Sequence, residues 1–87
     1  MGTFSSLSFY RLALALDYEE SGRVGEAQAL LRAALNQGGA SADVNFHLGR
    51  LYEKSGSESL ATGYYRDALK LDSKHVEAKR RLDRLVK

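Results

Sequence analysis

The feature that most constrains the fold is an internal repeat of 34 residues. When the chain is aligned with itself at this displacement, residues of the first half match residues of the second, for example Leu14 and Leu48. A repeat of this length encodes one supersecondary unit that buries its apolar face against its neighbour. Nine positions carry the same amino acid in both copies: Leu14/Leu48, Tyr18/Tyr52, Glu19/Glu53, Ser21/Ser55, Gly22/Gly56, Ala27/Ala61, Arg32/Arg66, Ala34/Ala68 and Leu35/Leu69. At two further pairs only the size of the residue is kept: both residues are small in Ala15/Gly49, and both are large in Leu31/Tyr65. The sequence therefore predicts two similar units.

Each unit is expected to be a pair of amphipathic helices joined by a tight turn. Small and large apolar residues alternate at helical spacing, which lets two helices approach closely and interdigitate. The Ser-Gly pairs ending at Gly22 and Gly56 place glycine where a helix commonly ends in the left-handed conformation. Proline is absent, and a composition rich in Ala, Leu, Glu, Arg and Lys favours helix. We predict an all-α fold with five helices, over residues 7–20, 24–36, 42–54, 58–71 and 74–87.

The second copy carries the motif Leu48-Gly49-x-x-Tyr52, then Gly56, then Ala61-x-x-x-Tyr65-x-x-Ala68 and Ser73. This pattern resembles the tetratricopeptide repeat (TPR) family, whose unit is a helix–turn–helix of this length. Gly39 and Ser73 stand where that family usually has proline, which should loosen the turn between repeats. The resemblance implies a right-handed α–α superhelix. Its parts would be a flexible segment over residues 1–7, repeat 1 over 8–41, repeat 2 over 42–75 and a capping helix over 76–87.

The resemblance also implies a concave groove, lined by the first helix of each repeat, that binds a partner protein. The predicted groove is apolar at its N-terminal end and basic at its C-terminal end. An apolar patch bordered by charge is typical of a peptide-binding surface. We therefore expect a peptide or helix with apolar anchors and an acidic end; alternatively, the basic residues only solvate the last helix. The candidate groove residues are Phe9, Leu12, Leu16, Phe46, Arg50, Lys54, Arg80 and Arg84.

The same resemblance argues against one known mode of binding. Some TPR domains hold the C-terminal carboxylate of a chaperone with a clamp of polar and basic residues. At the corresponding positions this chain has Leu12 and Leu16 in place of the required polar pair. A carboxylate-clamp co-chaperone is therefore not expected.

The chain offers little chemistry for catalysis. It has no cysteine, and His47 and His75 lie far apart in the sequence, so no metal site is predicted. No glycine-rich loop follows a strand, so no phosphate cradle is indicated. We predict a protein that is not an enzyme and that uses no cofactor.

Charge and hydropathy limit the remaining classes of partner. Residues 1–73 carry seven Lys or Arg and nine Asp or Glu, whereas residues 74–87 carry six and two. A single basic helix on an acidic body, without interleaved aromatic residues, is a weak footprint for nucleic acid, which is not expected as a partner. No apolar run approaches the roughly 20 residues that span a bilayer. The N-terminus lacks the basic region of a secretory signal, so we expect a cytoplasmic location.

An alternative function is that of a self-assembling scaffold, or oligomerisation domain, of a larger TPR protein. The first predicted helix has apolar residues around most of its circumference, including Phe4, Leu7, Tyr10 and Leu14. A helix that is apolar on several faces is usually covered on more than one of them. A preceding repeat or a second copy of the chain could cover this surface, or these residues could pack only against the second helix.

Overall fold

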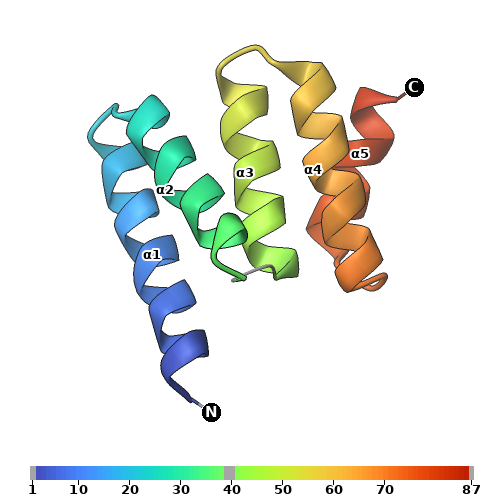
Figure 1. Ribbon diagram of the computed structural model, residues 1–87. Coiled ribbons are helices and arrows are strands. Elements are labelled where there is room, and N and C mark those ends of the chain that lie inside the picture. The colour runs from blue at the N-terminus through green and yellow to red at the C-terminus, as the bar shows by residue number, and fades with distance from the viewer. Residues whose placement is uncertain (1, 39–40, 87) are drawn as a thin grey trace. The chain divides into compact units, whose positions relative to one another are not determined.

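The computed structural model describes residues 2–38 and 41–86, and side chains from residue 9 onward. Within these residues the chain forms helices and no strand, which confirms the predicted all-α class (Figure 1). None of the helices in this described part has both the length and the apolar character needed to cross a membrane. The helices are α1 (Gly2–Glu20), α2 (Val24–Asn36), α3 (Ala42–Lys54), α4 (Glu58–Leu71) and α5 (Val76–Leu85).

Helices α2, α3 and α4 begin and end at the predicted residues, and the outer two helices differ from the prediction. Helix α1 begins at Gly2, so residues 2–7 of the predicted flexible segment are helical. No proline interrupts these residues, and nothing in their sequence therefore forces a later start. Helix α5 begins at Val76 instead of residue 74, because His75 is its N-cap: the Nδ1 atom of His75 accepts a hydrogen bond of 3.2 Å from the Ala78 amide.

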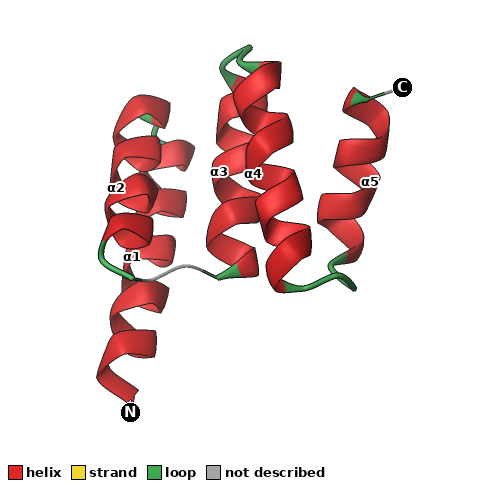
Figure 2. Ribbon diagram, turned by 45° about the vertical axis from the view of Figure 1, so that its right-hand side comes forward, coloured by secondary structure: helices red, strands yellow, loops and turns green. Residues whose placement is uncertain are grey.

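The chain divides into two compact units, residues 1–40 (unit 1) and 41–87 (unit 2). In unit 1, α1 packs against α2, and in unit 2, α4 packs against both α3 and α5. Figure 2 shows the turn that joins α3 to α4 and the loop that leads from α4 into α5. Each unit therefore contains one helical hairpin, and unit 2 has an additional helix.

The turns within the two hairpins have the same backbone geometry. Gly22 and Gly56 adopt φ angles of 81° and 86°, in the left-handed region that favours glycine. In the first turn the Arg23 amide donates to the Tyr18 carbonyl at 2.8 Å, and in the second the Ser57 amide donates to the Tyr52 carbonyl at 2.8 Å. These are the six-to-one hydrogen bonds of the Schellman motif, which satisfy carbonyls at the end of a helix. The predicted role of the Ser-Gly pairs is confirmed.

The repeated small and large residues form the cores of both units. Ala15, Ala27, Leu31 and Ala34 are fully buried, as are their counterparts Ala61, Tyr65 and Ala68. Gly49 is the counterpart of Ala15, and a Cβ atom built on it would lie 2.7 Å from the Tyr65 ring. Helix α3 can therefore approach α4 this closely only because residue 49 has no side chain. The core cluster of unit 2 consists of Phe46, Ala61, Tyr65, Ala68 and Ala78, surrounded by Tyr52, Leu69, Leu82 and Leu85.

Candidate functional site

A hollow in the surface of unit 2 is the strongest candidate for a functional site. Its volume is about 350 Å³, and it is lined by Arg50, Glu53 and Lys54 of α3 and by Arg81 of α5. Residues 50, 53 and 54 are three and four positions apart, so they project from the same face of α3. The volume falls at the lower end of the range of ligand pockets in proteins. Three cationic side chains around a single carboxylate make the hollow basic.

The carboxylate of Glu53 links all three helices of unit 2. The Tyr65 hydroxyl on α4 donates a hydrogen bond of 2.8 Å to Glu53 Oε1. On α5, Arg81 Nη1 lies 3.4 Å from Oε1 and Arg84 Nη2 lies 3.6 Å from Oε2. The Glu53 side chain is only 21% exposed. Arg84 therefore adds a fourth cation to the group around this carboxylate.

The hydrogen bond between Tyr65 and Glu53 has a definite direction. Burial, followed by the hydrogen bond to Glu53, raises the pKa of Tyr65 above its ordinary value. The hydroxyl consequently keeps its proton and donates, while the carboxylate accepts. This bond fixes the position of one Glu53 oxygen within unit 2.

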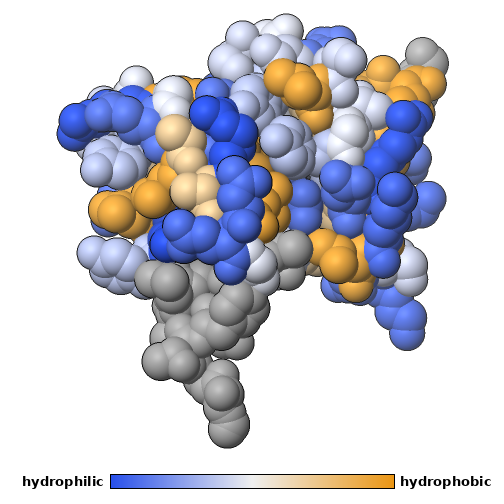
Figure 3. Space-filling model, in the orientation of Figure 1, coloured by the Kyte–Doolittle hydropathy of each residue, from blue (hydrophilic) through white to orange (hydrophobic). Residues whose placement is uncertain are grey.

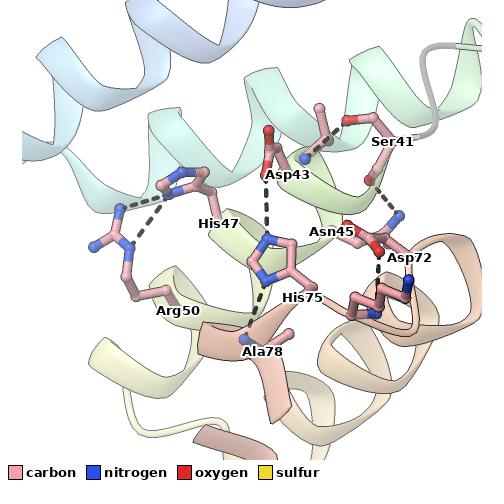
Figure 4. Close-up of polar contacts among 10 residues, drawn as sticks. Ser41, Asp43, Asn45, His47, Arg50, Asp72, His75 and Ala78 are labelled. Atoms are coloured by element: carbon pink, nitrogen blue, oxygen red, sulfur yellow. Dashed lines mark hydrogen bonds and ion pairs between the residues drawn. The ribbon is translucent and has the colours of Figure 1, made fainter. Parts of the chain in front are cut away.

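Arg50 is oriented by a neighbour on its own helix (Figure 4). Its Nε and Nη2 atoms lie 3.4 and 3.2 Å from Nδ1 of His47. A guanidinium group can only donate, so Nδ1 is the acceptor and the imidazole proton is on Nε2. This pairing holds Arg50 half-buried beside the hollow that it lines.

Phe46 was predicted to anchor a ligand in the groove, and the structure places its side chain in the core of unit 2. Its side chain is 5% exposed and belongs to the core cluster of unit 2. The guanidinium carbon of Arg81 lies 5.9 Å from the centre of its ring, and the ring of His75 lies 5.0 Å away. Because an anchor for a partner must offer exposed surface, Phe46 in this position serves the interior of the unit.

The other predicted groove residues fall into two groups. Phe9 (68% exposed), Leu12 and Leu16 (36% exposed) lie on α1 in unit 1. Their spacing of three and seven positions places them along one side of that helix. In unit 2, Arg50 and Lys54 line the hollow with Glu53, and Arg84 lies 3.6 Å from the Glu53 carboxylate. One continuous groove that includes both groups stays a prediction.

Arg81, and not the predicted Arg80, lines the hollow, and Arg80 is exposed. The apolar residues of α5 contain the signal that identifies this face. Arg81 follows the buried Ala78 by three positions and precedes Leu85 by four, so it shares their side of the helix. Tyr65 was expected only as a core residue, and its hydroxyl also binds Glu53.

A second polar cluster joins the beginnings of α3 and α5 (Figure 4). Nε2 of His75 lies 3.1 Å from the Asp43 carboxylate, while Nδ1 accepts from the Ala78 amide. With both ring nitrogens occupied in this way, His75 acts as a structural bridge. Within the described residues, no three His, Cys, Asp or Glu side chains are grouped so that they could hold a metal ion.

No protein-family model matches the chain, and no curated protein matches it. The resemblance to the TPR family therefore rests on the residues of the two repeats.

Proposed function

We propose that this chain is a non-catalytic module for protein–protein interaction, built from two TPR-like repeats and a capping helix in a right-handed superhelix. It binds an acidic segment of a partner protein. The observation that carries this proposal is the basic hollow of unit 2, which Arg50, Lys54 and Arg81 line together with Glu53. Arg84 lies 3.6 Å from the Glu53 carboxylate and adds a fourth cation. An acidic ligand matches the excess of positive charge.

The guanidinium groups of Arg81 and Arg84 keep N–H donors that a ligand could use. The distances of 3.4 and 3.6 Å from Arg81 and Arg84 to Glu53 exceed the 2.7–2.9 Å of a close charge-assisted hydrogen bond. Each guanidinium has five N–H donors, so a loose ion pair leaves several donors available to a second oxyanion. Arg is also the residue best suited to bind carboxylate and phosphate in two-point contacts.

The partner is proposed to carry apolar anchors as well as an acidic end. Phe9 and Leu16 offer exposed apolar surface on α1. Hydrophobic residues are visible over α1 and α2 in Figure 3. An extended or helical segment with both kinds of group would use preformed helices as its binding surface.

Reversing charge at the hollow tests this function. In a fluorescence titration with a labelled peptide that has Leu and Phe anchors followed by three glutamates, Lys54→Glu with Arg84→Glu should weaken binding about tenfold, because like charges then face each other. Lys54 is exposed and the Arg84 side chain is 61% exposed, so both substitutions should leave the helices intact.

A matched control distinguishes a local effect from one of net charge. Arg66→Glu with Lys70→Glu makes the same change of charge at two exposed positions of α4. We expect the control variant to bind almost as tightly as the unmodified chain. Equal losses in the two variants would show that the hollow is not the binding site.

A scaffold function remains the second candidate, and one observation favours it. Phe9 and Tyr10 are adjacent on α1 and are 68% and 64% exposed. Two neighbouring exposed aromatic rings are a common feature of protein interfaces. In this case the surface would be covered by another copy of the chain, and the oligomeric state would depend on concentration.

A further inference from the structure

A carboxylate lies among the cations of the hollow, where an acidic ligand would have to bind. An oxyanion that enters the hollow is attracted by Arg81, which lines it, and repelled by Glu53. Arg84 lies 3.6 Å from Oε2 of Glu53 and adds to the attraction of any anion that approaches that oxygen. The hydrogen bond from Tyr65 holds the carboxylate in place, so it cannot simply turn away from the ligand. The position of Glu53 therefore selects among acidic ligands.

Glu53 retains acceptor capacity that a ligand can use. A carboxylate has about four lone-pair sites. One oxygen, Oε1, accepts from Tyr65 at 2.8 Å, whereas the cation beside Oε2, Arg84, is 3.6 Å away. A ligand with a hydroxyl group could donate to Oε2 and convert the repulsion into a charge-assisted hydrogen bond.

We infer that the hollow selects a phosphate monoester in its monoprotonated form, carried on a phosphorylated side chain of the partner. Such a group offers oxygens to the guanidinium groups of Arg81 and Arg84 and a P–OH group to Glu53. A carboxylate or a sulfate ester offers acceptors only, and it leaves Glu53 facing another anion. This inference rests on the proposed function and assigns the chemistry of the acidic group that the partner provides.

Methyl phosphate and methyl sulfate test this selection directly. At about pH 5, below the second pKa of a phosphate monoester near 6, both carry about one negative charge. They have similar shapes, and only methyl phosphate has a proton to donate. Each is titrated into the full ¹⁵N-labelled chain while the Nε–H signals of Arg81 and Arg84 are followed by NMR. We expect methyl phosphate to bind about tenfold more tightly, because only it gains a hydrogen bond to a charged group.

Glu53→Gln is the decisive variant. Without the negative charge, methyl sulfate should bind more tightly than before, and the ratio between the two ligands should approach one. A second measurement does not depend on the folding of a variant. In the unmodified chain, methyl phosphate should shift the ¹³C signal of the Glu53 carboxylate, and methyl sulfate should leave it almost unchanged.

Three results would overturn the inference: equal binding of the two ligands, a ratio that Glu53→Gln leaves unaltered, or a Glu53 signal that methyl phosphate does not move. Failure here can be separated from failure of the proposed function with the anchored acidic peptide. If Lys54→Glu with Arg84→Glu selectively weakens that peptide while methyl phosphate shows no advantage, the hollow binds acidic segments without selecting phosphate. If the charge reversal has no selective effect on the peptide either, both proposals are wrong.

Discussion

At the scale of single residues, the close approach of α3 to α4 depends on the missing side chain of Gly49. Gly49 lies against Tyr65, and an added Cβ atom would be 2.7 Å from the ring carbons Cδ1 and Cε1. Tyr65 is fully buried, and its hydroxyl binds Glu53, so the ring cannot retreat without breaking that bond. The same tyrosine therefore fills the core of unit 2 and positions the carboxylate of the hollow.

Two glycine substitutions should have opposite effects on stability. Gly49→Ala should lower the free energy of unfolding by about 1–3 kcal/mol, because it overpacks the contact with Tyr65. Gly63 lies within α4, and a Cβ atom added to it would meet nothing within 4 Å beyond its own stretch of helix backbone. Gly63→Ala should therefore raise the free energy of unfolding by up to about 1 kcal/mol through helix propensity. Urea unfolding followed by circular dichroism measures both, and the same sign of change in the two variants would contradict this explanation.

At the scale of the elements, α5 is held by contacts at each end of its buried face. Its first turn is capped by His75, which also reaches Asp43 on α3. Farther along, Arg81 and Arg84 reach Glu53, while Ala78 belongs to the core cluster. The position of α5, and with it the two cations that pair with Glu53, therefore depends on a cap, an apolar face and a loose ion-pair network.

Replacing the cap should loosen α5 selectively. His75→Ala removes the acceptor for the Ala78 amide and should cost about 1 kcal/mol, as the loss of an N-cap usually does. His75→Asn, which can still accept from that amide, should recover most of the loss. Amide hydrogen exchange should show faster exchange in α5 than in α3 for the alanine variant. Equal protection in the alanine and asparagine variants would exclude the capping role.

At the scale of the whole molecule, the two units offer different surfaces. Unit 1 exposes Phe9 and Tyr10 on α1, and unit 2 carries the basic hollow. A partner with apolar anchors and an acidic end stays a prediction. Unit 1 also leaves an apolar surface that a second copy of the chain could cover.

Sedimentation velocity across a concentration series distinguishes these two uses of α1. The proposed function predicts a monomer at all concentrations, because its partner, and not a second copy, covers the exposed aromatic rings. Phe9→Ser should then weaken binding of the anchored peptide without changing the sedimentation coefficient. A dimer in the unmodified chain that Phe9→Ser dissociates would instead establish the scaffold function.

The sequence by itself determined the helices, the turns and the small and large core positions. These features depend on local rules: helical periodicity, the left-handed glycines at Gly22 and Gly56, and the alternation of residue size. The helical start of α1 was not predicted, because residues 2–7 contain no clear starting signal. The resemblance to the TPR family predicted Arg50, Lys54 and Arg84 as groove residues, and their role in binding stays a prediction.

Only the tertiary structure decided which of these side chains face the interior and which face the hollow. Successive residues of a helix point about 100° apart, so the rotation of α5 against its neighbours determines that Arg81 lines the hollow and Arg80 does not. Packing also placed Phe46 in the core. Glu53, Tyr65 and Arg84 come from three different helices. The distances from Tyr65 and Arg84 to the Glu53 carboxylate depend on how those helices pack, and no local sequence pattern determines them.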